Sequence, residues 1–578
     1  MIKKIRRRTP INSEDEGLAA LPPLIRRVLL NRRVTDLVAV DYSLSNLQPP
    51  GAMGGLDAAV ELLFEALTTQ KRVCILGDFD ADGATSTALA VRCLRAFGFQ
   101  SVSYIVPNRF EYGYGLTTEI VEVIATLSPD LLITVDNGIA SLEGVVAAQR
   151  HGMKVLVTDH HLPGATLPVA EAIVNPNQPG CNFGSKSLAG VGVIFYVMNA
   201  FRAYLRKLNW FVDHQLVEPR MADYLDLVAL GTVADVVPLD QNNRILVDQG
   251  LRRIRAGHCA HGIRALFEVG GRALPRLSAT DLGFVAGPRL NAAGRLDDMS
   301  LGIRCLLADT YNEARQVAVE LDSLNRERRA IEGSMQVEAI KYLDELLLHN
   351  KPWPLGICLY KDDWHQGVIG ILASRIKDKL HRPTIIFASS GDGTLKGSGR
   401  SIAGIHLRDV LDRIATGSPG LLTKFGGHAM AAGLSLDESK LEVFKVAFQT
   451  VVGELLDGKA PEAELLTDGG LEDDWFTLDS ARELESFGPW GQLFPEPCFD
   501  GAFRIISQRI VGEKHLKLQV TPAEYSGVAL AAIAFNVDLD VWPNNDIQQA
   551  TLVYKLSVNE YRGEQTLQLM VDYLEPAV

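Results

Sequence analysis

Three carboxylates lie close together in the run GDFDADG, as Asp78, Asp80 and Asp82. The apolar residues Val73–Leu76 before the run predict a buried strand, and the small residues after Gly83 predict a helix. Three carboxylates at the end of a strand repel one another unless a cation lies between them. Oxygen ligands suit hard divalent ions, so the run predicts a Mg²⁺ or Mn²⁺ site. The alternative is a solvated acidic turn in which Gly83 serves only the backbone.

Two further predicted strands also end in side chains that could bind a metal. Leu131–Val135 runs into Asp136, and Val155–Thr158 runs into Asp159, His160 and His161. Ligands of an open parallel sheet bind at the carboxyl ends of its strands, so we expect these side chains to meet the first three carboxylates there. A lone histidine usually has a structural explanation, but two adjacent imidazoles beside five carboxylates fit a metal site better.

A fourth segment could supply one more carboxylate. Residues 223–233 predict an amphipathic helix, which leads to Asp235 in a turn bounded by Pro238. Asp235 is therefore a further candidate ligand, although a carboxylate at this position could equally serve as a helix cap.

The elements that must hold these residues indicate an α/β protein. Between about 50 and 310, helices alternate with five predicted strands, which indicates a parallel sheet with helices on both faces. The strands are expected at 72–77, 101–106, 131–135, 153–158 and 172–174. A long helix is predicted over 312–350, and strands and helices alternate again up to about 455.

Two later regions have features that suit nucleic acid. Residues 396–401 are rich in glycine and predict a loop, whose backbone N–H groups together with Arg400 would suit a phosphate. The alternative is a simple turn. Short period-2 runs after residue 500 predict a small β-barrel of the oligonucleotide-binding type, which binds single strands through stacking and charge. The alternative is a barrel used only for packing.

Composition and charge bound the class of protein. A chain of 578 residues with 47% hydrophobic and 22% charged residues is typical of a globular protein with several domains. It has no apolar run of the length of a membrane span, and its seven cysteines lack paired spacing, so we expect a cytoplasmic protein without membrane contact. The net charge of −13 is uneven: residues 456–500 hold 12 acidic and 2 basic residues, whereas residues 1–40 hold 9 basic and 4 acidic ones. This asymmetry leaves room for a local basic track.

The order of the motifs is that of a known family. GDFDADG, VDNG, DHH and ADVVPL are followed by GPRLNAAGR, WHQGVIG and GGHAMAAG at 287–295, 364–370 and 426–433. In this order the chain resembles the DHH phosphoesterases that carry a DHHA1 domain, in particular their branch of single-strand-specific 5′→3′ exonucleases. The resemblance covers nearly the whole chain and implies two α/β lobes joined by a long helix, with a C-terminal oligonucleotide-binding barrel. The implied domains are a basic N-terminal extension (1–45), a DHH catalytic domain (46–311), a connecting helix (312–350), a DHHA1 domain (351–455), an acidic linker (456–499) and a DNA-binding barrel (500–578).

The resemblance also implies roles for individual residues. We expect a centre of two Mn²⁺ or Mg²⁺ ions that holds a hydroxide for in-line attack on the phosphodiester. The expected ligands are Asp78, Asp80, Asp82, Asp136, His160 and Asp235, with Asp136 as the bridge. Asp159 would support the imidazoles, and His161 would face the scissile phosphate or orient a ligand. The residues expected at the 5′ phosphate or along the DNA are Arg109, Arg289, Asn291, Arg295, Ser398, Arg400, His428, Lys514 and Lys517, although Arg289 and Arg295 could instead pair with Asp297 and Asp298.

The implied activity is the metal-dependent release of mononucleotides from the 5′ end of single-stranded DNA in repair and recombination. We expect a monomer that could act with a single-strand-binding protein and a helicase. Three alternatives stay open: a small-substrate phosphodiesterase, which ordinarily lacks the barrel; a pyrophosphatase, whose chain is shorter and whose first motif has a histidine; and a non-catalytic binding relative, which would be expected to lose ligands.

Overall fold

The structure is a computed structural model that describes residues 3–11, 15–108, 111–348, 353–524 and 529–577. The chain divides into two compact units. The larger unit contains Arg7–Leu324 and Leu466–Val578, and the smaller unit contains Met1–Arg6 and Asn325–Leu465.

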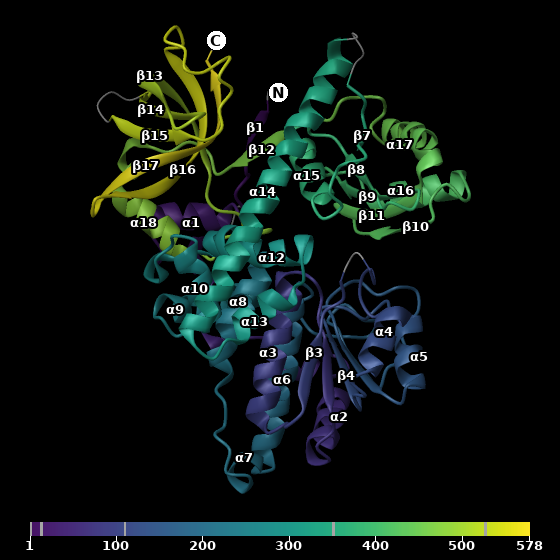
Figure 1. The fold of residues 1–578 in the computed structure, drawn as a ribbon. Coiled ribbons are helices and arrows are strands. Elements are labelled where there is room, and N and C mark those ends of the chain that lie inside the picture. Colours follow the sequence, from purple (N-terminus) through teal and green to yellow (C-terminus); the bar gives the residue numbers. More distant parts are fainter. Residues whose placement is uncertain (1–2, 12–14, 109–110, 349–352, 525–528, 578) are drawn as a thin grey trace. The chain divides into compact units, whose positions relative to one another are not determined.

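A five-stranded parallel sheet organises the first part of the larger unit, in the order β3-β2-β4-β5-β6. The five strands were predicted from the sequence, and each lies within one residue of its predicted position at both ends (Figure 1). Their bounds are Val73–Leu76 (β2), Val102–Ile105 (β3), Leu131–Val135 (β4), Lys154–Thr158 (β5) and Ala172–Val174 (β6).

Helices cover both faces of this sheet because its strands are apolar on both sides. Ile75 and Ile133 share a core with α2 (Leu56–Thr68), α3 (Ala81–Phe97) and α6 (Gly190–Lys207). Cys74 and Leu132 face the other way and pack with α4 (Thr118–Ala125) and α5 (Leu142–Arg150). The predicted α/β class, with helices on both faces, is confirmed.

A group of helices follows the sheet, and one of them differs from its prediction. The helix that leads to Asp235 is α8 (Leu225–Ala234), and every side chain from Leu225 to Thr232 is buried. The expectation of an amphipathic helix was therefore wrong, because neighbouring helices cover all sides of α8 and no face is left to water. The others are α7 (Trp210–Asp213), α9 (Gln241–Arg255), α10 (His261–Val269), α11 (Ala279–Asp281), a π-helical turn (Leu282–Ala286), α12 (Gly287–Leu296) and α13 (Ser300–Leu307).

The C-terminal strands of the larger unit form a closed barrel in the order β13-β14-β15-β17-β16. The predicted five-stranded barrel is thereby confirmed, although several strands are longer than expected. Their bounds are Phe499–Val511 (β13), His515–Pro522 (β14), Leu530–Ala534 (β15), Gln549–Tyr561 (β16) and Glu564–Pro576 (β17).

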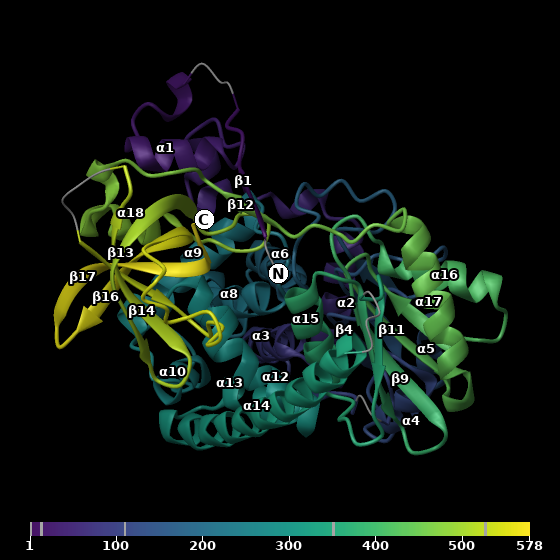
Figure 2. The same ribbon diagram turned by 90° about the horizontal axis from the view of Figure 1, so that it is seen from above.

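The acidic stretch before the barrel, expected as a linker, contains regular secondary structure. It contains β12 (Glu464–Thr467), which pairs with β1 (Lys4–Arg7), and α18 (Leu478–Phe487). In both ribbon views α18 lies beside α1 (Pro23–Leu30) and against the barrel (Figures 1 and 2).

Ion pairs, one of them fully buried, join the basic N-terminal residues to this acidic stretch. Both guanidinium amino groups of Arg32 contact the Asp468 carboxylate, at 2.8 and 3.0 Å, and the two side chains are only 2% and 1% exposed. Arg7 makes a similar forked contact with Asp500. Arg7 and Arg32 are therefore already paired within the molecule, whereas the uneven charge of the sequence left room for a basic track.

The smaller unit has a mixed sheet in the order β10-β11-β9-β8-β7, in which only β7 and β8 are parallel. Its strands are Ile357–Tyr360 (β7), Thr384–Ser389 (β8), Thr394–Arg400 (β9), Lys424–Gly427 (β10) and Ala431–Asp437 (β11). Its helices are α15 (Ile369–Leu380), α16 (Leu407–Gly417) and α17 (Leu441–Leu455). The long helix expected at 312–350 is α14 (Tyr311–Leu348), which belongs to the larger unit up to Leu324 and to the smaller unit beyond it.

The glycine-rich stretch 396–401, predicted as a loop, is mostly strand β9. Gly397 and Gly399 point into the core, where a Cβ would lie 2.6 Å from Leu434 or Leu407. These glycines therefore serve close packing of a central strand, and Ser398 and Arg400 lie on its other, more exposed face.

No helix in the described ranges combines the length and apolar character that crossing a membrane requires.

We expect Asp468→Asn to lower the free energy of unfolding of the larger unit by about 3–5 kcal/mol, because it leaves a buried Arg32 without its counter-charge. Urea unfolding followed by circular dichroism would measure the change. Asp479→Asn is the matched control, since Asp479 pairs with Arg482 at an exposed site of the larger unit and its loss should cost less than about 1 kcal/mol. An equal loss of unfolding free energy in the two variants would contradict a stabilising role of the buried pair between Arg32 and Asp468.

Candidate metal centre

The first acidic run lies where β2 ends and α3 begins. The Asp80 carboxylate caps α3 by accepting hydrogen bonds from the backbone N–H groups of Asp82 and Gly83, at 2.9 and 3.0 Å. The Asp78 carboxylate accepts one from the N–H of Phe79 at 2.8 Å. The local backbone therefore fixes both carboxylates at the carboxyl end of the sheet.

Asp82 is buried and is held by a segment far away in the sequence. Its two carboxylate oxygens accept hydrogen bonds from the backbone N–H groups of Gly190 and Val191, at 2.6 and 2.9 Å, in the first turn of α6. Burial, followed by the nearby charge of Asp235, raises the pKa of Asp82 to about 7. No pattern in the sequence indicated these backbone donors.

Asp136 occupies the centre of the site in a left-handed backbone conformation, with a φ of 64°. Such a φ is uncommon for a residue other than glycine and is often found at functional sites. Burial, together with the charges of Asp82 and Asp80, raises the pKa of Asp136 well above its usual range. A cation beside this carboxylate would relieve both effects.

His160 lies between Asp136 and Asp235. Its Nε2 atom is 3.1 Å from Asp136 Oδ1 and 3.5 Å from Asp235 Oδ2. Burial lowers the pKa of His160, and burial raises that of Asp235 to about 7 with a further contribution from Asp80. A neutral imidazole is the form that binds metals.

His161 points to a different partner. Its Nδ1 atom lies 2.8 Å from Asp159 Oδ1, and its ring contacts the Tyr114 hydroxyl, which is 3.2 Å from Nε2. Although burial lowers the pKa of His161, the Asp159 carboxylate outweighs that effect and raises it to about 9. Tyr114 also lies 3.3 Å from the backbone carbonyl of Asp136, so it links His161 to the centre. Sequence reasoning missed Tyr114, since no spacing distinguishes it from a surface tyrosine.

The donor set fits a pair of divalent cations. Three groups of side chains could each hold a metal ion, because the potential ligand atoms within each group lie within 4.8 Å of one another. Asp136 and His160 each belong to two of these groups. Asp136 Oδ1 and His160 Nε2 are buried and have no hydrogen-bond partner among the residues that the structure describes, as expected of atoms that bind a metal. All six predicted ligands occur in the groups, which are Asp78, Asp80 and Asp136; Asp82, His160 and Asp235; and Asp136, His160 and His161.

The predicted DNA contacts in the larger unit have varied surroundings. Arg289 is buried and pairs with Asp322 at 2.8 Å, rather than with Asp297 or Asp298, so its guanidinium is already engaged. The Asn291 side-chain oxygen accepts a hydrogen bond from the N–H of Ala81 at 2.8 Å and so supports the start of α3. Arg295 is half-buried on α12, and Arg109 lies outside the described residues.

The predicted contacts in the smaller unit and the barrel are more exposed. Ser398 and Arg400 are neighbours on β9, with 3.3 Å between the serine Oγ and the arginine Nη1. His428 is exposed in the turn after β10. Lys514 is exposed in the turn between β13 and β14, and Lys517 is half-buried on β14.

Comparisons with known proteins give the family. The chain matches the models of three domain families. They are the DHH family N-terminal domain at 72–232, the DHHA1 domain at 355–454 and the RecJ OB domain at 467–573. A curated protein from Dickeya dadantii, named single-stranded-DNA-specific exonuclease RecJ, is 54% identical over 576 residues and is matched over 100% of both chains. The chain belongs to the RecJ family.

Solved structures of the RecJ family agree with this assignment. RecJ from Thermus thermophilus in complex with Mn²⁺ is 31% identical, with a TM-score of 0.81 over 100% of this chain and 79% of that one. The same protein in complex with Mg²⁺ is 29% identical, with a TM-score of 0.74 over 100% and 78% of the two chains. The predicted fold, with DHH, DHHA1 and oligonucleotide-binding domains, is therefore the fold of this family.

We expect Gly190→Ala to weaken Mn²⁺ binding by about 10- to 100-fold, because a Cβ there would lie 2.6 Å from Asp136 Cβ and 2.7 Å from its Oδ1. Titration with Mn²⁺ followed by electron paramagnetic resonance would measure the free ion. Gly51→Ala is the control, since its Cβ would meet no atom within 4 Å. An unchanged affinity of Gly190→Ala for Mn²⁺ would show that metal binding does not depend on the present position of Asp136.

Proposed function

We propose that this RecJ family member is a metal-dependent exonuclease that degrades single-stranded DNA from the 5′ end to 5′-mononucleotides. The observation that carries the proposal is the shared position of Asp136, whose carboxylate lies in one group with Asp78 and Asp80 and in another with His160. A carboxylate between two clusters of oxygen and imidazole donors suits a bridge between two ions. The single-strand-specific activity of the curated RecJ proteins supports the choice of substrate.

The chemistry of the donor set suits Mn²⁺ or Mg²⁺, the ions named for the Thermus protein. Bound at this site, the two ions would supply a polarised water and neutralise negative charge on the phosphate. The residues that would hold them are Asp78, Asp80, Asp82, Asp136, His160 and Asp235.

Two side chains of the protein, Asp159 and His161, would help to orient the scissile phosphate. Asp159 holds the His161 imidazole at 2.8 Å and also accepts a hydrogen bond from the backbone N–H of Ile139, so it is itself fixed. Held in this way, His161 can donate a hydrogen bond to an oxygen of the scissile phosphate. Asp159 thus acts as a positioning residue and His161 as the group that touches the substrate.

Polarity requires a place for the 5′ phosphate. Within the smaller unit, Ser398 and Arg400 offer a hydroxyl and a guanidinium side by side on the more exposed face of β9. This pair suits a terminal phosphate, because a guanidinium can bind two of its oxygens. On the barrel, Lys514 and Lys517 would contact the backbone of the following strand.

The proposed setting is DNA repair and recombination in the cytoplasm. There the protein would act as a monomer, and a single-strand-binding protein and a helicase would supply its substrate. This part rests on the family resemblance and on the barrel that matches the RecJ OB domain.

Asp136→Ala should abolish hydrolysis of single-stranded DNA, because it removes the carboxylate shared by two donor groups, while DNA binding remains detectable. Release of acid-soluble nucleotide with Mn²⁺ measures hydrolysis, and a filter-binding assay measures binding. Asp57→Ala, at an exposed position in the first turn of α2, should retain full activity. Turnover close to normal in Asp136→Ala would remove Asp136 from the mechanism.

The polarity is tested with one single strand labelled at either end, beside a blunt duplex. Mononucleotide should be released first from the 5′-labelled strand, and the duplex should be spared. Arg400→Ala should reduce the rate about tenfold on a 5′-phosphorylated strand and less on a 5′-hydroxyl strand, since only the former loses a charged contact. Equal losses on the two strands would show that Arg400 does not bind the terminal phosphate. Cleavage of very short oligonucleotides alone would favour the small-substrate alternative.

A further inference from the structure

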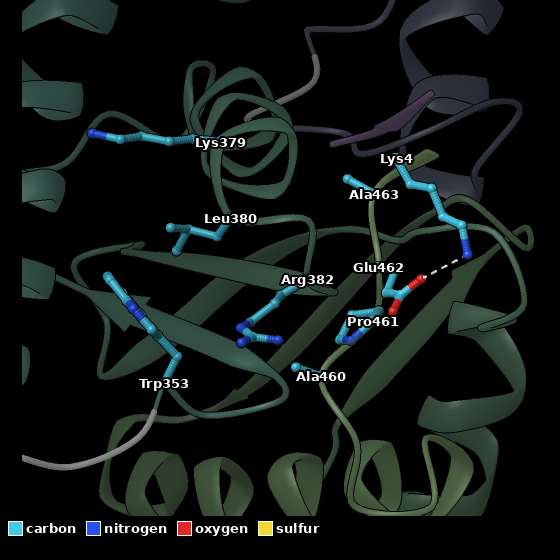
Figure 3. A pocket seen from close by; sticks show the side chains of 9 residues that line it. All are labelled: Lys4, Trp353, Lys379, Leu380, Arg382, Ala460, Pro461, Glu462 and Ala463. Atoms are coloured by element: carbon cyan, nitrogen blue, oxygen red, sulfur yellow. Dashed lines mark ion pairs between the residues drawn. The ribbon is translucent and has the colours of Figure 1, made fainter. Parts of the chain in front are cut away.

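The smaller unit contains a pocket of about 1030 Å³ to which the mechanism assigns no role (Figure 3). It lies between the end of α15, the residue Arg382 just before β8, and the irregular stretch that leads to β12. All its lining residues belong to this unit, and none of them is a candidate metal ligand. They are Lys4, Trp353, Lys379, Leu380, Arg382 and the run 460–463.

The pocket carries uncompensated positive charge. Lys4 has a partner in Glu462, 3.7 Å away, but no ion pair or hydrogen bond engages the Arg382 guanidinium among the described residues. Burial lowers the pKa of Arg382, and no acidic group opposes that effect. The neighbouring His381 has its pKa lowered by burial and by the charges of Lys377, Lys3 and Arg382. A half-buried cation in a positive environment favours an anion as its missing partner.

The same pocket has a flat apolar wall. Figure 3 shows the Arg382 side chain extending between Trp353 on one side and Ala460 with Pro461 on the other. The Lys379 ammonium group points away from the other labelled side chains, so we assign it no direct contact. An indole and an unpaired guanidinium that line one pocket suit a ligand that joins an aromatic ring to a phosphate, because bases stack on tryptophan and phosphates bind arginine. The volume is close to the upper limit for small-molecule sites.

We propose that this pocket binds a nucleotide unit, with its base against Trp353 and its phosphate on Arg382. The unit could come from two sources, a free nucleoside monophosphate or a nucleotide within a bound single strand. The inference does not depend on the proposed exonuclease function, since it uses none of the residues of the metal centre.

The test uses the full-length protein in EDTA, which keeps the metal centre from contributing. Calorimetric titration with thymidine 5′-monophosphate should detect binding, and inorganic phosphate should bind at least about tenfold more weakly because it cannot stack. Arg382→Ala and Trp353→Ala should each weaken binding of the nucleotide about tenfold or more. Arg382→Lys and Trp353→Phe should restore part of the affinity.

Arg408→Ala is the matched control, because Arg408 is an exposed arginine of the same unit that lies outside the pocket. A second arm replaces the monophosphate with a nuclease-resistant phosphorothioate oligothymidylate. Loss of monophosphate binding in both pocket variants supports the free nucleotide as the source. If the pocket variants lose affinity only for the oligonucleotide, and lose more of it than Arg408→Ala does, the result supports a nucleotide unit within the strand. If the pocket variants lower the affinity for neither ligand more than Arg408→Ala does, the proposal is overturned.

Discussion

Repulsion among buried carboxylates is the constraint on which the catalytic edge of the sheet depends. Burial raises the pKa values of Asp82, Asp136 and Asp235, so the ionised forms are costly unless positive charge is brought close. The fold supplies part of that charge through helix N-termini, because Asp80 caps the N-terminus of α3 and the first turn of α6 donates to Asp82. Such termini carry only about half an elementary charge each. Bound cations would supply the remainder, since the fold holds the acids in place without neutralising them.

This arrangement joins segments that are far apart in the sequence. Strands β2, β4 and β5 each deliver one part of the site to the same edge, and the end of α8 brings Asp235 against them. α6 must approach so closely that Gly190 has no room for a side chain beside Asp136. A metal bound here would therefore stabilise the contacts between these elements as well as take part in the chemistry.

The sequence was sufficient for the elements and for the candidate ligands, but not for what surrounds them. Apolar runs placed the five strands of the first sheet, and the rule for strand ends brought Asp136 and His160 to the first acidic run. The contacts of Asp82 with the backbone of α6 and the position of Tyr114 stayed hidden, because a linear pattern does not say which segments face each other. The run around Ser398 was misjudged for the same reason. Its glycines suggested a loop, whereas the bulky side chains that require them come from β8, β11 and α16.

Charge counts have a similar limit, since they do not say whether the partner of a basic segment lies inside or outside the molecule. The N-terminal arginines fitted a track for DNA, yet Arg7 and Arg32 are engaged by Asp500 and Asp468. A guanidinium that already has a buried carboxylate partner gains little from a phosphate and would leave that carboxylate unpaired. Lys514 and Lys517 of the barrel have no ion-pair partner among the described residues and keep their charge available. The pairing of Arg7 and Arg32 should therefore weaken the attraction of DNA to the basic N-terminal segment, whereas the two barrel lysines keep their full charge for it.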